Sequence, residues 1–190
     1  MNLLHRWYCR SGGWARKLQG TMMPWALNGV ELGEDVLEIG PGPGLSTDWL
    51  RAKVPHLTSI EIDDRFAAIL RRRLDGTDVT VVEGDATDMS FPDASFGAVV
   101  CFTMLHHVPS AELQDRLLAE AFRVLRPGGV FVGADSTPNL IWNLFHVLDT
   151  RVPVPPSTFA GRLQAAGFGE AEVERGEGVF RFRARRPAAS

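Results

Sequence analysis

The chain has 190 residues, of which 45% are hydrophobic and 23% charged, and its formal net charge is -3. These values are typical of a globular domain and exclude a disordered chain, a collagen-like chain and a strongly cationic nucleic-acid binder. No apolar run approaches the ~20 residues of a membrane-spanning helix, and residues 1–30 lack the apolar core of a secretory signal. Two cysteines, Cys9 and Cys101, are too few for a disulfide framework or a zinc site, so we expect a cytoplasmic domain without a metal ion.

The first 30 residues contain no acid and combine four basic residues with four large aromatic ones: Arg6, Arg10, Arg16, Lys17, Trp7, Tyr8, Trp14 and Trp25. We expect a helix over residues 14–30 and a shorter one within residues 2–10. Exposed aromatics would make such a segment prone to aggregation, so residues 1–30 are predicted to form a helical lid over the carboxyl ends of the strands. A chain starting at Glu31 is then expected to keep the rest of the fold. A subunit contact and a membrane-surface anchor are the alternatives.

From residue 35 onward, short apolar strands alternate with amphipathic helices. Strands are expected at residues 36–39, 57–62, 79–82, 98–102 and 130–132, and helices at residues 45–54, 64–74 and 111–125. Asp63 or Asp64 can cap the second of these helices and Ser110 the third. The buried face of the second helix is expected to carry Phe66, Ile69, Leu70 and Leu74. This alternation predicts a doubly wound, largely parallel α/β sheet.

The end of the chain has a different pattern. Prolines at 153, 155 and 156 predict a rigid connector, which leads into a helix over residues 159–166 that Gly167 ends. Residues 171–174 and 179–185 flank two glycines and predict a hairpin of two strands. With no sign of a second core, residues 31–190 are expected to form one domain.

The strongest pattern is the segment VLEIGPGPGLST, in which the first expected strand runs into three closely spaced glycines. Gly40, Gly42 and Gly44 allow a tight turn and a close approach of the backbone to a ligand. Their spacing is G-x-G-x-G, whereas the dinucleotide fingerprint needs G-x-G-x-x-G. The carboxylate of Glu38 would repel a pyrophosphate but suits a ligand that carries cationic groups. Both features disfavour a nicotinamide-dependent oxidoreductase.

Other polar residues follow the later strands. Glu61, in SIEIDD, comes 21 residues after Gly40, about the spacing at which an acid reaches ribose hydroxyls in such folds. Asp85, in VVEGDATDM, follows the third strand, where a carboxylate can accept a hydrogen bond from an adenine amine; a turn residue is the alternative. His106 and His107, in AVVCFTMLHHV, are acid–base candidates because their intrinsic pKa is near neutral. A histidine packed in the loop is the alternative there.

In this order, the glycine loop, the acid after the second strand, GDA, LHHV and LRPGG resemble the class I S-adenosylmethionine-dependent methyltransferases, in particular their type 11 branch. The resemblance covers roughly residues 35–185. It implies a Rossmann-like, doubly wound α/β fold with a seven-stranded sheet, mostly parallel with the last strand antiparallel, and helices on both faces. It also implies methyl transfer from S-adenosyl-L-methionine to a small-molecule acceptor that the sequence does not identify, with no nucleic-acid partner.

By the same resemblance, Glu38 orients the cofactor's ammonium, the loop glycines approach its methionine part, Glu61 binds the ribose hydroxyls and Asp85 holds the adenine. The implied cofactor-binding residues are Glu38, Gly40, Pro41, Gly42, Gly44, Glu61, Ile62, Asp85, Ala86, Cys101 and Phe102. Cys101 and Phe102 are expected near the transferable methyl group. His107, and after it His106, are the candidate catalytic residues. The segment over residues 135–156 and the N-terminal helices are expected to select the acceptor.

Two alternatives remain open. The segment VLEIGPG with LTSIEIDDRFAAILRRRL also resembles the rRNA adenine dimethyltransferases, which carry an N-x-P-[YF]-type motif after the fourth strand. CFTMLHH stands at that place, so the residues that hold an adenine amine are missing. The other alternative is a non-catalytic relative that binds the cofactor, because intact cofactor-binding residues do not exclude a loss of turnover.

Overall fold

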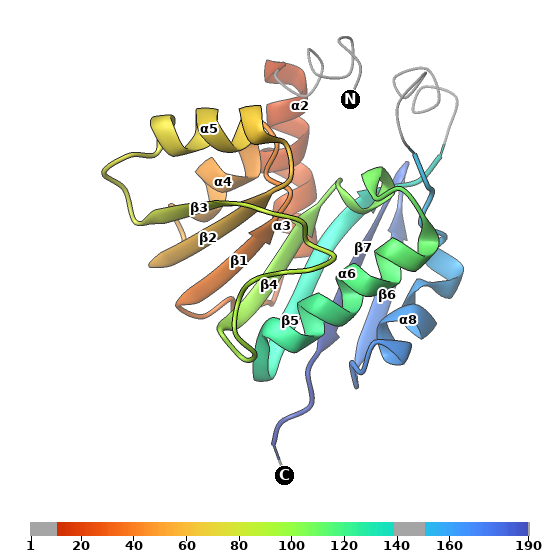
Figure 1. The fold of residues 1–190 in the computed structure, drawn as a ribbon. Helices are drawn as coiled ribbons and strands as arrows, with labels where there is room; N and C mark the ends of the chain where they lie inside the picture. The colour runs from red at the N-terminus through yellow and green to blue at the C-terminus, as the bar shows by residue number, and fades with distance from the viewer. Residues whose placement is uncertain (1–10, 139–150, 190) are drawn as a thin grey trace.

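The computed structural model describes residues 11–138 and 151–189, which form a seven-stranded sheet with helices on both faces (Figure 1). The strand order is β3-β2-β1-β4-β5-β7-β6. Strands β1 to β5 are parallel, and β7 is antiparallel to both β5 and β6. The strands are β1 (Asp35–Ile39), β2 (His56–Glu61), β3 (Val79–Glu83), β4 (Phe96–Phe102), β5 (Leu125–Ser136), β6 (Ala171–Gly176) and β7 (Val179–Arg185). The predicted fold class is confirmed.

The two faces of the sheet carry separate apolar cores because side chains alternate along each strand. Leu37, Ile39, Val99 and Cys101 lie in one core, together with residues of α6 (Ala111–Val124) and α8 (Pro156–Ala165). Val36, Ala98, Val100 and Phe102, which alternate with them along β1 and β4, point to the opposite face and join the second core. The central strands are therefore buried on both sides, as the continuous apolar pattern of residues 98–102 predicts.

The helix caps confirm the local signals in the sequence. Asp63 Oδ1 accepts hydrogen bonds from the backbone N–H groups of Arg65 and Phe66 at 3.0 and 3.1 Å, so Asp63 caps α5 (Asp64–Arg73). Ser110 Oγ accepts from Leu113 N at 3.2 Å and caps α6. The predicted burial of Ile69 is wrong: its side chain is 50% exposed, and Ala67 takes its place on the buried face of α5.

Some element boundaries differ from the prediction. Helix α4 (Leu45–Leu50) ends four residues earlier than expected. Strand β5 begins at Leu125, directly after α6, and so includes the RPGG turn that was expected to separate them. Leu125 pairs with Phe96 of β4, the register then shifts, and the pairing resumes at Val130 opposite Ala98, so the turn lies inside the strand as an irregularity.

The N-terminal segment forms a continuous helical stretch made of α2 (Gly12–Lys17), a π-helical part η1 (Leu18–Met22) and α3 (Met23–Ala26). Its buried side chains belong to the second core: Leu18, Met22, Met23, Ala26 and Leu27. The guanidinium of Arg181, on β7, lies 5.0 Å from the Trp25 ring and donates a hydrogen bond to the Trp25 carbonyl.

This part of the expected lid therefore covers a face of the sheet, and its buried side chains make up part of the second core. Residues 1–10, with their predicted helix and Cys9, lie outside the described residues. Within the described ranges, no helix is both long enough and apolar enough to cross a membrane.

Candidate functional site

The glycine loop joins the carboxyl end of β1 to α4, and Gly40, Gly42 and Gly44 all have positive φ, at 65°, 53° and 87°. A Cβ atom at Gly40 would lie 2.3 Å from Met104 Cγ, and one at Gly44 would lie 2.2 Å from an Arg73 nitrogen. A Cβ atom at Gly42 would meet no atom within 4 Å. A side chain at Gly40 or Gly44 would therefore have to displace neighbouring side chains, whereas Gly42 exposes backbone to open space that a ligand can approach.

Glu38 lies on β1 just before this loop, with only 1% of its surface exposed. Its Oε2 atom accepts hydrogen bonds from Thr47 Oγ1 and Ser59 Oγ, both at 2.7 Å. Its Oε1 atom is buried and has no hydrogen-bond partner among the described residues. Burial raises the pKa of Glu38, although nearby hydroxyls act in the opposite direction. A buried carboxylate oxygen without a donor fits a ligand that brings a cation or an N–H group.

Glu61, at the end of β2, connects the glycine loop to the start of α5. Its Oε2 atom accepts from Gly42 N at 2.8 Å, and its Oε1 atom accepts from Asp63 N at 2.9 Å. Burial raises the pKa of this carboxyl group as well. Each carboxylate oxygen can accept a second hydrogen bond, so the arrangement orders the loop and still leaves acceptor capacity for a ligand's hydroxyls. The sequence spacing predicts the location of Glu61 but not its hydrogen bond to the loop.

Ile62 follows Glu61 and is 69% exposed, which is unusual for a large apolar side chain at the end of a buried strand. Ile62 and Ile69 are the two exposed large hydrophobic residues in the described part of the chain. Ile62 directly follows Glu61, whose carboxylate accepts the hydrogen bond from Gly42 in the glycine loop. The side chain of Ile62 therefore offers an apolar surface near this loop, against which a flat ring can pack.

Asp85 lies past the end of β3, next to Glu61 in space, since Gly84 N donates to the Glu61 carbonyl at 3.0 Å. Asp85 Oδ1 accepts from Thr87 N at 2.8 Å, and its carbonyl accepts from Asp88 N at 3.1 Å. These bonds form an Asx turn that fixes the exposed side chain. Asp85 is thus both a turn residue and a site candidate, and Ala86 follows it, half-buried.

Cys101 and Phe102 end β4, which pairs with the end of β1 through Ile39 and Cys101. Both side chains are buried, in cores on opposite faces of the sheet. Burial raises the pKa of the Cys101 thiol well above its ordinary value. The neighbouring Met104, which packs against Gly40, is the side chain from this region that borders the loop. Met104 is not among the predicted site residues, because a methionine after a strand carries no local signal for this contact.

The two histidines form η2 (Leu105–His107), a turn at the carboxyl ends of β4 and β5. His106 is 2% exposed, and its Nδ1 atom lies 2.5 Å from Oδ1 of the buried Asp135. His107 is half-buried, and its ring centroid lies 4.2 Å from that of His106. Asp135 is predicted only as the first residue of the segment over residues 135–156 and not as a site residue of its own, although it shares the signal that identified the other acids, a carboxylate at the end of a strand.

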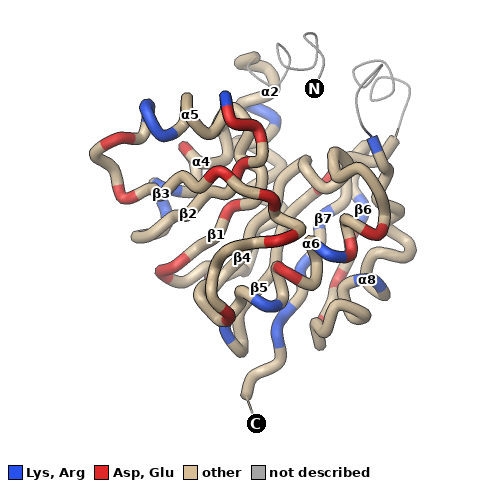
Figure 2. Tube along the Cα trace, in the orientation of Figure 1, with Lys and Arg blue, Asp and Glu red and all other residues tan. Residues whose placement is uncertain are grey.

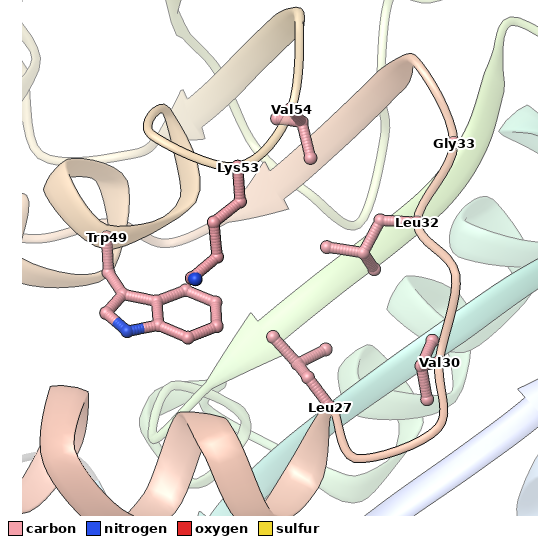
Figure 3. A pocket seen from close by; sticks show the side chains of 7 residues that line it. All are labelled: Leu27, Val30, Leu32, Gly33, Trp49, Lys53 and Val54. Atoms are coloured by element: carbon pink, nitrogen blue, oxygen red, sulfur yellow. The ribbon is translucent and has the colours of Figure 1, made fainter.

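A surface cavity of about 300 Å³ lies elsewhere, between the loop that follows α3 and the helix α4 (Figure 3). Leu32 and Gly33 precede β1 and Val54 precedes β2, so this cavity lies at the amino ends of the strands. Lys53 Nζ lies 4.3 Å from the centroid of Trp49 at its edge. The residues predicted from the sequence gather at the opposite edge of the sheet, where open α/β folds bind ligands.

The chain is similar to several known proteins. A family model described as "Methyltransferase domain" matches residues 37–133, about half of the chain. A protein of Mycolicibacterium smegmatis whose name describes an S-adenosylmethionine-dependent methyltransferase is 34% identical over 157 residues, covering 78% of this chain and 56% of the relative. A fatty-acid O-methyltransferase of the same species is 34% identical over 108 residues, covering 56% of this chain and 38% of the relative. The chain thus spans about half the length of the curated relatives it matches.

Among solved structures, phosphoethanolamine N-methyltransferase 2 of Haemonchus contortus, in complex with S-adenosyl-L-methionine, has a TM-score of 0.75 to this chain. The match covers 98% of this chain and 60% of the other at 14% sequence identity. At this identity the likeness shows the fold alone.

Proposed function

Because the chain belongs to the methyltransferase-domain family of class I S-adenosylmethionine-dependent methyltransferases, we propose that it transfers a methyl group from S-adenosyl-L-methionine to a small, lipid-like acceptor. The cofactor supplies a methyl group on a sulfonium centre, and the protein supplies binding, alignment and exclusion of water. The observation that carries the proposal is the unpartnered, buried Oε1 atom of Glu38 beside the open backbone at Gly42.

The residues at this edge of the sheet fit the parts of the cofactor in order. Glu38 meets the ammonium group and Gly42 the methionine backbone, between Gly40 and Gly44, with Pro41 stiffening the loop. Glu61 accepts hydrogen bonds from the ribose hydroxyls, while Ile62 and Ala86 border the adenine ring and Asp85 accepts from its amine. Cys101 and Phe102 bring the end of β4 close to the methyl group. These roles are supported by the location of each residue at the carboxyl ends of β1 to β4.

The acceptor is proposed to be lipid-like because a relative that covers over half of this chain is named as a fatty-acid O-methyltransferase. The charges on the described surface support a small acceptor over a nucleic acid. Arginines on α5, α6 and the β6–β7 hairpin pair with neighbouring acids, so the two signs of charge are interspersed (Figure 2). As a separate part of the proposal, residues 1–30 act as a cover on the domain of residues 31–190.

The binding test is isothermal titration calorimetry with S-adenosylhomocysteine, and with NAD as the control ligand. We expect one molecule of S-adenosylhomocysteine to bind per chain and NAD to give no signal. Glu38→Gln keeps the size of the side chain but removes the charge that faces the ammonium, so its affinity should fall at least tenfold. Micromolar binding of NAD without binding of S-adenosylhomocysteine would overturn the proposal.

The raised pKa of Glu38 gives this binding a pH dependence. Below pH 4.5, the ordinary pKa of a glutamate, Glu38 is protonated and the unliganded fold has the full stability that this neutral form allows. This contribution to the stability is lost as the pH rises through the raised pKa that Glu38 has in the folded chain. A cationic ligand favours the ionised carboxylate, so affinity should increase over that same rise in pH, with release of a proton. Glu38→Gln should lose this part of the pH dependence, which calorimetry in buffers of different ionisation enthalpy detects.

Ile62 offers a second test with a matched control on the same stretch of chain. Ile62→Ala removes apolar surface that the adenine ring would cover, at ~1 kcal/mol, so S-adenosylhomocysteine should bind about fivefold more weakly. Ile69→Ala removes a similarly exposed side chain on α5 and should leave affinity unchanged. Equal affinities for both variants and the wild type would show that Ile62 does not contact the ligand.

A further inference from the structure

The last turn of α5 carries three arginines, Arg71, Arg72 and Arg73, whose surroundings differ (Figure 2). Arg71 turns to β3, where its Nε atom donates a hydrogen bond to the Val81 carbonyl at 3.1 Å. Arg72 is exposed and makes no polar contact with any described residue. Arg73 reaches the glycine loop, so one arginine of the three can influence the proposed cofactor site.

The Arg73 guanidinium contacts the end of the loop through two of its nitrogens. Nη1 donates to Asp48 Oδ2 on α4 at 2.6 Å, and Nη2 donates to the carbonyls of Gly44 and Pro43 at 3.3 and 3.5 Å. A Cβ atom at Gly44 would lie 2.2 Å from Nη2. The guanidinium therefore occupies the space that a side chain at position 44 would need.

These contacts lie where the loop becomes a helix. Gly44 is the N-cap of α4, with φ 87°, and no side chain caps this helix end. The Gly44 carbonyl accepts the first helical hydrogen bond, from Asp48 N at 3.0 Å, and Arg73 binds both residues of that turn. The donors of a guanidinium form a rigid, planar fork, which suits it to bind two groups at once. Arg73 therefore holds the left-handed backbone at Gly44 and the first turn of α4 together.

The loop has a separate attachment at Gly42. Gly42 N donates to Glu61 Oε2 at 2.8 Å, and Glu61 also accepts a hydrogen bond from Asp63 N, just before α5 begins. The loop is thus attached near the start of α5 through Glu61 and at the end of α5 through Arg73. Because α5 is one continuous helix, the two attachments fix Gly42 and Gly44 relative to each other.

We propose that Arg73, held in place by Asp48, is a positioning residue for S-adenosylmethionine. It keeps the end of the loop, at Pro43 and Gly44, in the conformation that binds the methionine part of the cofactor. This rests on the proposed function and adds a residue that acts through the loop, since the polar contacts of Arg73 are with the loop backbone and Asp48.

The effect of Arg73 is expected in ligand binding more than in unfolding. The ion pair with Asp48 is partly exposed, and such pairs contribute little to the stability of a fold. A loop that adopts its binding conformation for only part of the time binds a ligand more weakly in proportion to that fraction. Loss of Arg73 should therefore lower the affinity for the cofactor while the fold stays intact.

The first test is calorimetry on the full chain with S-adenosylhomocysteine and with adenosine, which lacks the homocysteine part. We expect Arg73→Ala to bind S-adenosylhomocysteine about tenfold more weakly than the wild type, and adenosine within about twofold. Arg72→Ala removes the same charge from the neighbouring position and should bind both ligands like the wild type. An equal loss for both ligands in Arg73→Ala would indicate a general structural role and overturn the proposal, as would an unchanged affinity for S-adenosylhomocysteine.

A double-mutant cycle tests whether Asp48 holds Arg73 in place. Asp48→Asn keeps the size of the side chain but removes the ion pair, so it should weaken S-adenosylhomocysteine binding about threefold. The double variant with Arg73→Ala should bind no more weakly than Arg73→Ala alone, because the same contact is lost in both. Arg51 Nε lies 3.3 Å from the other oxygen of Asp48, and Arg51→Ala is the control that should keep wild-type affinity. Additive losses in the double variant would contradict the proposed arrangement.

Hydrogen exchange measures the order of the loop without any ligand. The amides of Gly44 and Asp48, bonded to the carbonyls of Pro41 and Gly44, should exchange about tenfold faster in Arg73→Ala and at the wild-type rate in Arg72→Ala. Unchanged rates in Arg73→Ala would overturn the proposal. If the wild-type chain does not bind S-adenosylhomocysteine, the proposed function fails, and the exchange rates still decide whether Arg73 orders the loop.

Discussion

A chain that begins at Glu31 is expected not to fold, because the helical segment before it provides part of the second core. Leu18, Met22, Met23 and Leu27 are at most 9% exposed and pack with residues of β1, β4 and β5. Burial of each such side chain contributes about 1.5–3 kcal/mol, so together they approach the about 5–15 kcal/mol of net stability that a domain has. Circular dichroism and thermal unfolding should show no cooperative transition for this chain.

Two controls separate packing from a covering role. A chain that begins at Ser11 keeps every described contact of this segment and should unfold cooperatively. Met23→Ala, at a side chain with none of its surface exposed, should cost ~2–5 kcal/mol, whereas Thr21→Ala on the exposed side should stay within about 0.5 kcal/mol. A native-like transition for the chain that begins at Glu31 would show that the segment only covers a sheet that is stable without it.

Glu61→Ala is expected to weaken S-adenosylhomocysteine binding at least tenfold, and about 100-fold if both ribose hydroxyls depend on this carboxylate. Charge-assisted hydrogen bonds contribute ~1.5–3 kcal/mol each. The substitution also removes the acceptor of Gly42 N and so loosens the loop that must approach the ligand. Calorimetry measures the affinity, and thermal unfolding checks that the fold is intact.

Asp63→Asn is the matched control for this experiment. It keeps an oxygen that can cap α5, and it removes the other carboxylate close to the expected ribose position. We expect its affinity to stay within about twofold of the wild type. An affinity loss for Asp63→Asn together with wild-type affinity for Glu61→Ala would move the ribose contact to Asp63.

The two buried carboxylates, of Glu38 and Glu61, lower the stability of the unliganded fold and favour ligand binding. Burial raises the pKa of both Glu38 and Glu61, which means that the unliganded fold bears the cost of two ionised groups in a poorly solvated place. A ligand that brings an ammonium group and hydroxyls offsets this cost only when it binds. Both residues therefore stabilise the complex more than the unliganded chain, as is common where a site is preorganised for charge.

The sequence by itself determined the features that depend on near neighbours. Local patterns predict the alternation of strands and helices, because the periodicity of apolar side chains differs between the two. They also predict the caps at Asp63 and Ser110, because a capping side chain bonds to a backbone N–H group only two or three residues later. The carboxylates at strand ends are found from the same strand pattern. The spacing of the glycines identified the loop for the same reason. A backbone with positive φ favours glycine at that position whatever the rest of the fold, so the glycines mark the turn in the sequence.

Only the tertiary structure decided which distant groups meet. Glu61 reaches Gly42 over 19 residues, and His106 reaches Asp135 over 29, because parallel strands bring their carboxyl ends together whatever their separation in the chain. Composition likewise did not reveal that Leu18, Met22, Met23, Ala26 and Leu27 pack with strand residues in the second core, because these contacts join residues far apart in the chain. The spacing of apolar residues in α5 places Ile69 on the apolar face of the helix, yet its side chain is exposed. Burial depends on which part of that face contacts the sheet, and the periodicity of the helix sequence does not determine this.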